Sequence, residues 1–373
     1  MIRSRGRHIL AIVCLAAAPK LAMAQGEEAR GVTFGVTYTT EAFSVVRGGV
    51  RGDTSAYLGS LVPTLTLDLG RMGFGRGQFY VSAQALRGSG ISGSRVGAVQ
   101  ALSNLEEQRF GKFIEAWYAD AYCGGNIRLK AGRQYADADF GVVENGADFL
   151  NSSYGLNPTT PMPTYPAPEL GVSIWVAPAP WISWGFGAYQ GGDLEPQSEG
   201  GSSVQRRPFT IFEARLEPFR KSSNWNGSYH VGMWRQSRAA WLATAEPGAP
   251  VRNYGVYATA DQWFRRSPSG DHRGPGLFFQ WGWTPADRNE VAGYLGGGVA
   301  YAGLLPGRRK DSAGVGVTRA KLGPARAETI VEWFYKCRIS PHLTLQPDLQ
   351  WVMHPAGTGR GALVAGVRME MGF

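Results

Sequence analysis

The residues best suited to binding chemistry gather in one stretch, 135–169, which is rich in acids, amides and aromatic rings. Charged and amide groups form strong hydrogen bonds with hydroxyl groups. Aromatic rings carry partial negative charge on their faces, which favours contact with C–H groups. A sugar offers both surfaces, because its hydroxyls lie along the ring edge and its C–H groups on the ring face. The stretch therefore predicts weak sugar binding, although any single aromatic could instead anchor the stretch to the fold.

Two basic residues, Arg128 and Lys130, precede this stretch at a spacing that places both on one face of an extended segment. Together with the acids and rings they form the predicted substrate-binding set: Arg128, Lys130, Arg133, Tyr135, Asp137, Asp139, Glu144, Asp148, Phe149, Asn151 and Tyr154. A second set, near the C-terminus, is expected to line a water-filled interior of the fold together with Arg128 and Lys130. It consists of Glu328, Glu332, Lys336, Arg368 and Glu370.

Patterns for catalysis or metal binding are weak. The histidines show neither a metal-ligand spacing nor a neighbouring G-x-S-x-G motif. Asp137 and Asp139 resemble the start of a calcium loop, but Val142 stands at the sixth place, where such a loop needs glycine. Ser228 lies two residues before His230 and would share its face of a strand, so a barrel hydrolase with a Ser–His pair remains an alternative. We expect no enzymatic activity, no metal and no cofactor.

The N-terminus predicts export. Three arginines within the first seven residues precede an apolar run over 9–18, and the segment ends on Ala22-Met23-Ala24. This order is typical of a secretory signal peptide, and the run is too short to cross a bilayer as a helix. We expect a signal peptide over residues 1–24, cleaved after Ala24. Bulky residues before Cys14 argue against lipid attachment at that cysteine.

The composition after this segment is that of neither a nucleic-acid-binding protein nor a helical membrane protein. The formal charge of +9 includes the four basic residues of the signal segment, so the remaining charge is mild. The chain has 52 Gly, 12 Trp, 15 Tyr and 17 Phe, yet its mean hydropathy is only −0.20. No stretch after the signal is long and apolar enough for a membrane helix. Cys123 and Cys337 remain, and the sequence does not show whether they pair.

Alternation of apolar and polar residues predicts a transmembrane antiparallel β-barrel over residues 25–373. The clearest case is the C-terminal stretch 363–373, where apolar residues of one parity lead to a terminal Phe373. Such strands show one apolar face to lipid and one polar face to water. We expect about sixteen strands, beginning near Val32, Ala56, Gln78, Lys112, Asn126, Leu170, Trp181, Phe209, Gly227, Asn253, Gly276, Val291, Ala313, Ala327, Leu343 and Ala362.

The lengths of the connections support this topology. With both ends of the chain in the periplasm, links after even-numbered strands should be short and links after odd-numbered strands can be long. The predicted short links include 123–125, 177–180 and 338–342, and the predicted long links include 88–111, 135–169, 191–207 and 237–252. Link 265–275 is long for a periplasmic turn and is the exception.

Several motifs in a fixed order carry a resemblance to a known family. They are Phe113-Ile114-Glu115-Ala116-Trp117-Tyr118, Leu129-Lys130-Ala131-Gly132-Arg133, Phe149-Leu150-Asn151-Ser152-Ser153-Tyr154-Gly155, Tyr165-Pro166, Leu170-Gly171-Val172, Pro306-Gly307-Arg308 with Asp311, Glu328-Thr329, and Leu345-Gln346-Pro347-Asp348-Leu349-Gln350 with His354-Pro355. This set resembles the carbohydrate-selective porins of the OprB type. The resemblance implies an outer-membrane barrel of about sixteen strands with a narrowed, sugar-preferring channel. It also implies that link 135–169 folds inward as the constriction, whereas link 88–111 shows no matching motif.

The sequence therefore predicts a bacterial outer-membrane porin through which glucose-like monosaccharides and small saccharides diffuse passively. A general or anion-preferring porin is the alternative, suggested by four basic residues that we place on the channel side: Arg128, Lys130, Arg319 and Arg368. The expected partners are small sugars, outer-membrane lipid and the barrel-assembly machinery, which would recognise the strand that ends on Phe373. We expect no nucleic-acid partner.

Overall fold

The computed structural model describes residues 31–50, 55–190, 208–218, 226–238, 251–264, 274–323 and 325–373. The predicted signal peptide, link 191–207 and most of links 237–252 and 265–275 lie outside the described residues.

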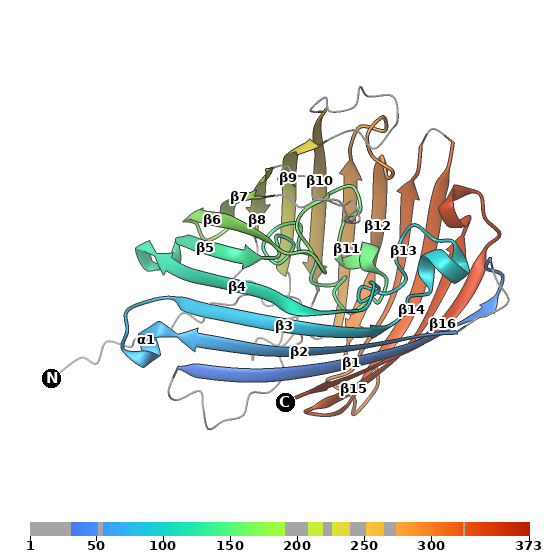
Figure 1. The fold of residues 1–373 in the computed structure, drawn as a ribbon, viewed down its shortest axis with the longest axis horizontal. Coiled ribbons are helices and arrows are strands. Elements are labelled where there is room, and N and C mark those ends of the chain that lie inside the picture. Colours follow the sequence, from blue (N-terminus) through green and yellow to red (C-terminus); the bar gives the residue numbers. More distant parts are fainter. Residues whose placement is uncertain are drawn as a thin grey trace, which may run out of the picture.

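Sixteen antiparallel strands of the described chain close into a barrel (Figure 1). In chain order they are β1 (Val32–Arg47), β2 (Ser55–Asp68), β3 (Gln78–Gly88), β4 (Phe110–Tyr122), β5 (Ile127–Gln134), β6 (Glu169–Ala179), β7 (Ile182–Tyr189), β8 (Phe209–Leu216), β9 (Asn226–Arg238), β10 (Val251–Trp263), β11 (Gly274–Trp283), β12 (Gly293–Ala302), β13 (Ser312–Lys321), β14 (Ala327–Ser340), β15 (Leu343–Met353) and β16 (Ala362–Gly372). The short helical turns are α1 (Leu69–Met72), α2 (Ser152–Gly155), η2 (Ser92–Val96), η3 (Cys123–Gly125) and η4 (Pro355–Gly357). Among the described residues, no helix is long and apolar enough to cross a membrane.

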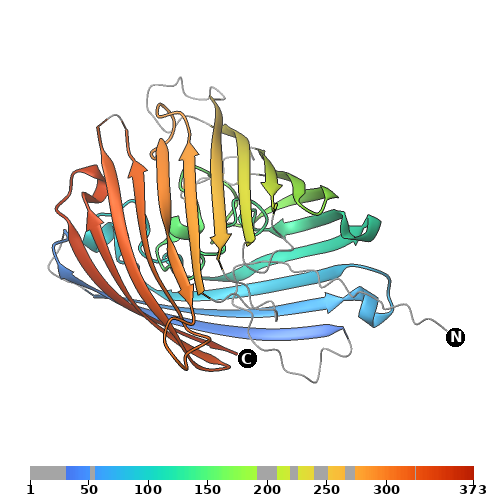
Figure 2. The ribbon, with the colours of Figure 1, turned by 180° about the vertical axis from the view of Figure 1, so that it is seen from behind.

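Each strand pairs with its neighbours in sequence, and β1 pairs with β16 to close the ring, as views from opposite sides show (Figures 1 and 2). The predicted fold is confirmed, and every strand begins within two residues of its predicted start. Cys123 and Cys337 are both free thiols.

The alternation in the sequence becomes the two faces of the wall. In β11 the side chains of Leu277, Phe279, Trp281 and Trp283 point outward and are 41–45% exposed, while Gln280 between them is fully buried on the inner side. Successive residues of a strand point to opposite faces. A shift of one residue in the pairing of a strand would therefore exchange its outward-facing and inward-facing side chains.

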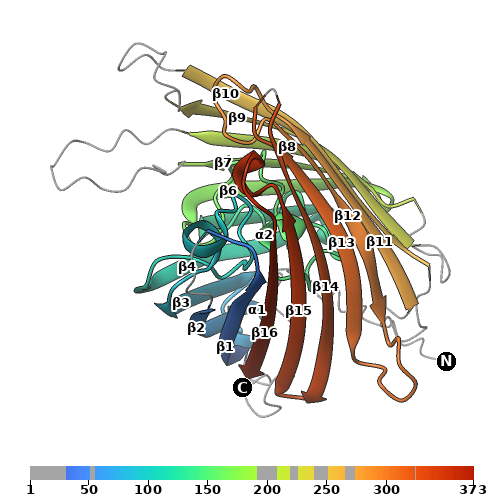
Figure 3. The same ribbon diagram turned by 90° about the vertical axis from the view of Figure 1, so that its right-hand side faces the viewer.

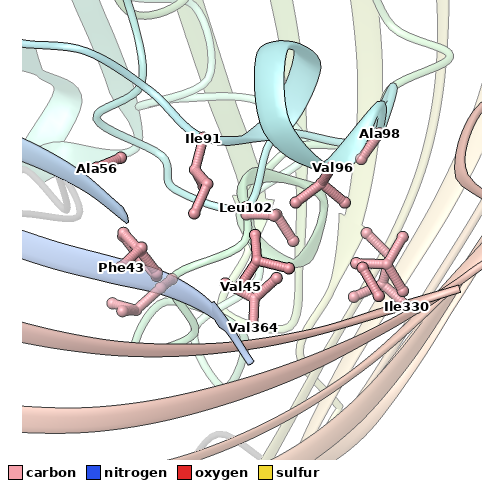
Figure 4. Packing of buried hydrophobic residues seen from close by; sticks show 12 residues of the cluster. Phe43, Val45, Ala56, Ile91, Val96, Ala98, Leu102, Ile330 and Val364 are labelled. Atoms are coloured by element: carbon pink, nitrogen blue, oxygen red, sulfur yellow. The ribbon is translucent and has the colours of Figure 1, made fainter. Parts of the chain in front are cut away.

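Two links fold back into the barrel instead of extending from it: residues 89–109, between β3 and β4, and residues 135–168, between β5 and β6 (Figure 3). We call them inner loop A (89–109) and inner loop B (135–168). Inner loop A inserts Ile91, Val96 and Leu102 into an apolar cluster on the wall of β1, β14, β15 and β16 (Figure 4). No sequence motif predicted the position of this loop. Burial of such side chains stabilises by about 1.5–3 kcal/mol each, which holds inner loop A against the wall.

Inner loop B packs on the wall between β6 and β14 through two further clusters. Phe140 and Met162 lie among aromatic residues of β6 to β10, and Phe149 and Tyr154 pack on Phe278 and Phe334. The inner face of β13 carries a glycine, Gly316, beneath these rings. A Cβ atom there would lie 2.5 Å from Tyr154 and 2.9 Å from Phe149, so the missing side chain is what admits the loop.

Candidate channel constriction

A row of wall carboxylates holds inner loop B by its backbone. Glu332 of β14 accepts hydrogen bonds from the N–H groups of Leu150 and Asn151, at 2.6 and 3.0 Å. Asp261 of β10 accepts the N–H groups of Glu144 and Asn145 at 2.8 and 2.9 Å. A carboxyl group offers two acceptor oxygens to two successive N–H groups, which would otherwise be unpartnered at a buried surface.

The same device holds inner loop A. Glu328 of β14 accepts the N–H groups of Val99 and Gln100, at 2.9 and 2.8 Å, and that of Ala356 at 2.8 Å. Glu328 and Glu332 were expected to face the channel, and the structure places both on the inner face. Both are fully buried beneath the loops, so their role is to position the loops.

One ion pair lies where inner loop B meets β14. The carboxylate of Asp148 lies 2.8 Å from Lys336 Nζ and accepts a hydrogen bond of 2.7 Å from the Ser312 hydroxyl. Burial alone would raise the pKa of Asp148, but the Lys336 ammonium and the Ser312 hydroxyl outweigh it and hold this pKa below its ordinary value. Both partners are partly exposed, so the pair lies at the edge of the open space.

A second ion pair lies where inner loop B meets β5. Lys130 Nζ lies 3.4 Å from the carboxylate of Asp139, which also accepts a hydrogen bond of 3.0 Å from Ser173. Arg215 of β8 donates to the backbone oxygen of Asp139 at 3.1 Å and stacks on Trp175, on the same ring that Arg128 approaches. Arg215 was not predicted as a site residue. It lies two residues from the buried Glu213 on the same strand and therefore faces the inside of the barrel as well.

A third ion pair joins β16 to β1 and inner loop A. Arg368 pairs with Glu41, and its guanidinium donates to Asn104 Oδ1 at 2.5 Å. Glu41 also accepts a hydrogen bond of 2.5 Å from the Ser103 hydroxyl. Glu370 lies on the same inner face of β16 and is half-buried. Neither Glu41 nor Asn104 was predicted, because these contacts join segments far apart in the sequence.

Acids and tyrosines gather near the start of inner loop B. Asp137 accepts a hydrogen bond of 2.5 Å from the Thr164 hydroxyl. Burial raises the pKa of Asp137 to about 6, although the Thr164 hydroxyl opposes the rise. The backbone N–H of Tyr135 donates to Glu115, and the hydroxyl of Tyr165 donates to the backbone oxygen of Leu105 on inner loop A. The Tyr165 contact joins the two inner loops.

The structure corrects part of the predicted site. Phe149, Asn151 and Tyr154 are at most 1% exposed, so these side chains anchor inner loop B and do not line open space. Arg133 of β5 pairs with Leu170 of β6, whose side chain points outward. Arg133 therefore lies on the outer face. Arg319 pairs with the outward-facing Leu295 and lies on the outer face as well. Glu144, by contrast, is exposed on inner loop B.

The Ser–His pair proposed for a hydrolase lies beside Glu213, a carboxyl group that anchors inner loop B. Ser228 Oγ lies 2.7 Å from His230 Nε2, and His230 Nδ1 lies 3.4 Å from Glu213. This order of groups resembles a catalytic triad. Glu213, however, accepts hydrogen bonds of 2.7 Å from both the backbone N–H of Gly141 and the hydroxyl of Tyr257. His230 and Glu213 are both buried, so the pair is not open to a substrate.

Known proteins share this fold. Porin B of Pseudomonas aeruginosa is 21% identical over 92% of this chain and 88% of its own length. The high-pH structure of Pseudomonas putida OprB superposes with a TM-score of 0.82 at 20% identity, over 93% of this chain and 95% of the other. The low-pH structure of the same porin gives a TM-score of 0.61 at 19% identity, over 93% and 94%.

The sequence model of the carbohydrate-selective porins of the OprB family matches residues 53–373. The described wall and its inward loops provide the closed barrel that such a channel requires. The chain therefore belongs to the OprB family of carbohydrate-selective porins, which are channels of the outer membrane and not enzymes.

Proposed function

We propose that inner loops A and B together form the selective constriction of this sugar channel. A barrel of this strand number encloses an aqueous channel too wide to discriminate between small solutes by its wall alone. Both loops lie inside it and are tied to the wall by buried carboxylates. We propose the following residues as those that contact the passing solute: Arg128, Lys130, Tyr135, Asp137, Asp139, Glu144, Asp148, Lys336 and Arg368.

The observation that carries the proposal is that charged residues of the proposed lining are paired with opposite charges. Lys130 faces Asp139, Lys336 faces Asp148, and Arg368 faces Glu41. Paired charges present strong hydrogen-bonding groups while leaving little net field. A neutral solute rich in hydroxyls gains from such a lining more than an ion does, which favours sugars over the anion-preferring alternative.

We infer that the preferred solutes are glucose-like monosaccharides and small saccharides. Each hydrogen bond to the lining contributes about 0.5–1.5 kcal/mol, and a ring contact about as much. A few such contacts give weak binding, which a channel needs because a tightly held solute would leave slowly.

Liposome swelling with glucose and gluconate tests the proposal, because these solutes are similar in size but differ in charge. We expect glucose to enter faster than gluconate. Asp139→Asn should raise gluconate entry, because it leaves the charge of Lys130 unbalanced, while Arg319→Gln, on the outer face, should change neither rate. Equal or faster entry of gluconate in the wild type would favour the anion-preferring porin.

We also propose that residues 1–24 are a signal peptide cleaved after Ala24 and that the strand ending on Phe373 engages the barrel-assembly machinery. The basic start, apolar run and A-x-A end support the first proposal. N-terminal sequencing of the protein extracted from outer membranes tests it, with Gln25 expected as the first residue.

A further inference from the structure

Two basic residues, Arg319 and Lys321, lie side by side on the outer face of the barrel at the end of β13. Arg319 pairs with the outward-facing Leu295, and Lys321, two residues further on, points to the same face. Both side chains are exposed. Two residues of an extended strand span about 7 Å, so these two long side chains can reach one small anion.

Lys321 lies at one rim of the wall. It is the last residue of β13 and pairs with the first residues of β12 and β14, Gly293 and Ala327. Gly293 in turn pairs with Trp283, the last residue of β11, so this row bounds four strands that lie side by side in Figure 1. The row belongs to the extracellular rim, because β13, like β3 and β5, ends there and the long inner loops follow β3 and β5.

The neighbours of the pair place it where hydrocarbon meets lipid headgroups. Trp281 and Trp283 of β11 lie in the rows of Arg319 and Lys321, and aromatic residues of membrane barrels gather at this level. A cation on the lipid face costs far less there than at the midplane. One step further into the membrane the outward positions are apolar, namely Phe279, Gly297, Val317 and Val331.

No acidic residue of these two rows balances the two positive charges. Arg319 donates a hydrogen bond of 3.2 Å to the hydroxyl of Thr329, which is a neutral partner. Like charges this close repel each other, and more strongly beside hydrocarbon, where the dielectric constant is low. An anion bound between them would remove this repulsion. The rows consist of Trp281, Leu295, Arg319, Thr329 and Met353, and of Trp283, Gly293, Lys321 and Ala327.

We propose that Arg319 and Lys321 bind one phosphate group of a phosphorylated glycolipid of the outer leaflet, whose acyl chains lie on the apolar positions below them. A guanidinium group binds phosphate through paired N–H donors, and an ammonium group binds it as a point charge. In a bacterial outer membrane, the leaflet at this rim consists mainly of glycolipids with phosphates on their sugar headgroup. A second copy of this chain is a poorer occupant, because a two-fold contact centred on the pair brings the cations of both copies together.

Native mass spectrometry of the detergent-solubilised porin, titrated with diphosphorylated lipid A, tests the proposal. The double variant R319Q/K321Q should bind roughly tenfold to thirtyfold more weakly, whereas the swap R319K/K321R, which keeps both charges, should bind nearly as the wild type does. The matched control is R133Q/K310Q, which also removes one arginine and one lysine. Arg133 lies on the outer face of β5, across the ring from β13, and Lys310 lies in the link between β12 and β13.

Folding of each variant is checked by the heat-dependent gel mobility of the barrel, and glucose block of single-channel current should keep its wild-type value because both residues lie outside the channel. Dephosphorylated lipid A and phosphatidylglycerol should bind the wild type less tightly than diphosphorylated lipid A. Equal affinity of the wild type and R319Q/K321Q would overturn the proposal, as would an equal loss in R133Q/K310Q. Equally tight binding of dephosphorylated lipid A or of phosphatidylglycerol would overturn it as well, and so would a dimer whose formation excludes the lipid.

Discussion

At the scale of single residues, carboxylates of the barrel wall act mainly as acceptors for the backbone of the two inner loops. Glu332 is the clearest example, because it is fully buried and binds two successive N–H groups of inner loop B. A glutamine at this position would accept these hydrogen bonds more weakly, and its NH₂ group would be a donor placed against the N–H donors of the loop.

We expect Glu332→Gln to weaken docking of inner loop B by about 2 kcal/mol. The loop should then fluctuate, which raises the noise of the open-channel current and exposes the loop to protease. The control is Glu370→Gln, because within the described part of the chain Glu370 makes no hydrogen bond to either inner loop. A quiet, protease-resistant Glu332→Gln channel would contradict the anchoring role.

Asp137 should make ion selectivity depend on pH. Burial raises its pKa to about 6, above the value of an exposed aspartate. Its protonated form is therefore favoured in the docked loop, so the contribution of this residue to docking is present at low pH and is lost as the pH rises through about 6. Between pH 7 and pH 5 Asp137 loses its negative charge, so the ion selectivity of the channel should shift toward anions.

Reversal potentials measured across a salt gradient from pH 7 to pH 5 test this expectation. Asp137→Asn should remove the transition near pH 6. Asp148→Asn should leave the transition in place, because the pKa of Asp148 lies below its ordinary value and this group stays ionised over the range. A transition that persists in Asp137→Asn would assign it to another group.

At the scale of elements, inner loop B is the longer of the two inward links. Replacing residues 140–163 by a short Gly-Ser linker should raise single-channel conductance and abolish glucose block, because the channel then widens toward the bare barrel. Far-UV circular dichroism and gel mobility control for folding of the barrel. Wild-type conductance and block in a folded variant would place the constriction in inner loop A.

Strand positions were predictable because alternation is a local property, whereas the contacts of the loops were not. Glu328 binds Gln100 across 228 positions of sequence, and nothing local distinguishes an anchoring glutamate from one that lines water. Phe149 and Tyr154 were assigned to the solute for the same reason. Arg133 is different: the alternation that places Lys130 inside already places Arg133 outside, so this error could have been avoided from the sequence.

At the scale of the whole molecule, the barrel closes where the last strand meets the first. The backbone N–H and carbonyl of Phe373 exchange hydrogen bonds of 2.9 Å with Val36 of β1, and its ring stacks on His342 at 6.1 Å between centroids. Phe373 therefore lies at the seam, one residue beyond the end of β16, and its side chain is 69% exposed.

We expect deletion of Phe373 to lower the amount of folded barrel in cells while leaving the conductance of each assembled channel unchanged. Quantitative blotting of outer membranes and single-channel recording measure the two properties separately. Phe373→Tyr should assemble better than the deletion because it keeps an aromatic end. Assembly of the deletion at the wild-type level would show that the terminal ring is dispensable.

The close approach of inner loop B to β13 also limits how this porin can diverge. Because Tyr154 and Phe149 occupy the space above Gly316, a larger residue at 316 requires a smaller ring on the loop. Inner loop B and the strand beneath it are therefore expected to change together among related porins. We expect that inner loop B of a related porin, transplanted into this barrel, keeps its solute preference only when the wall glycines beneath it are transplanted as well.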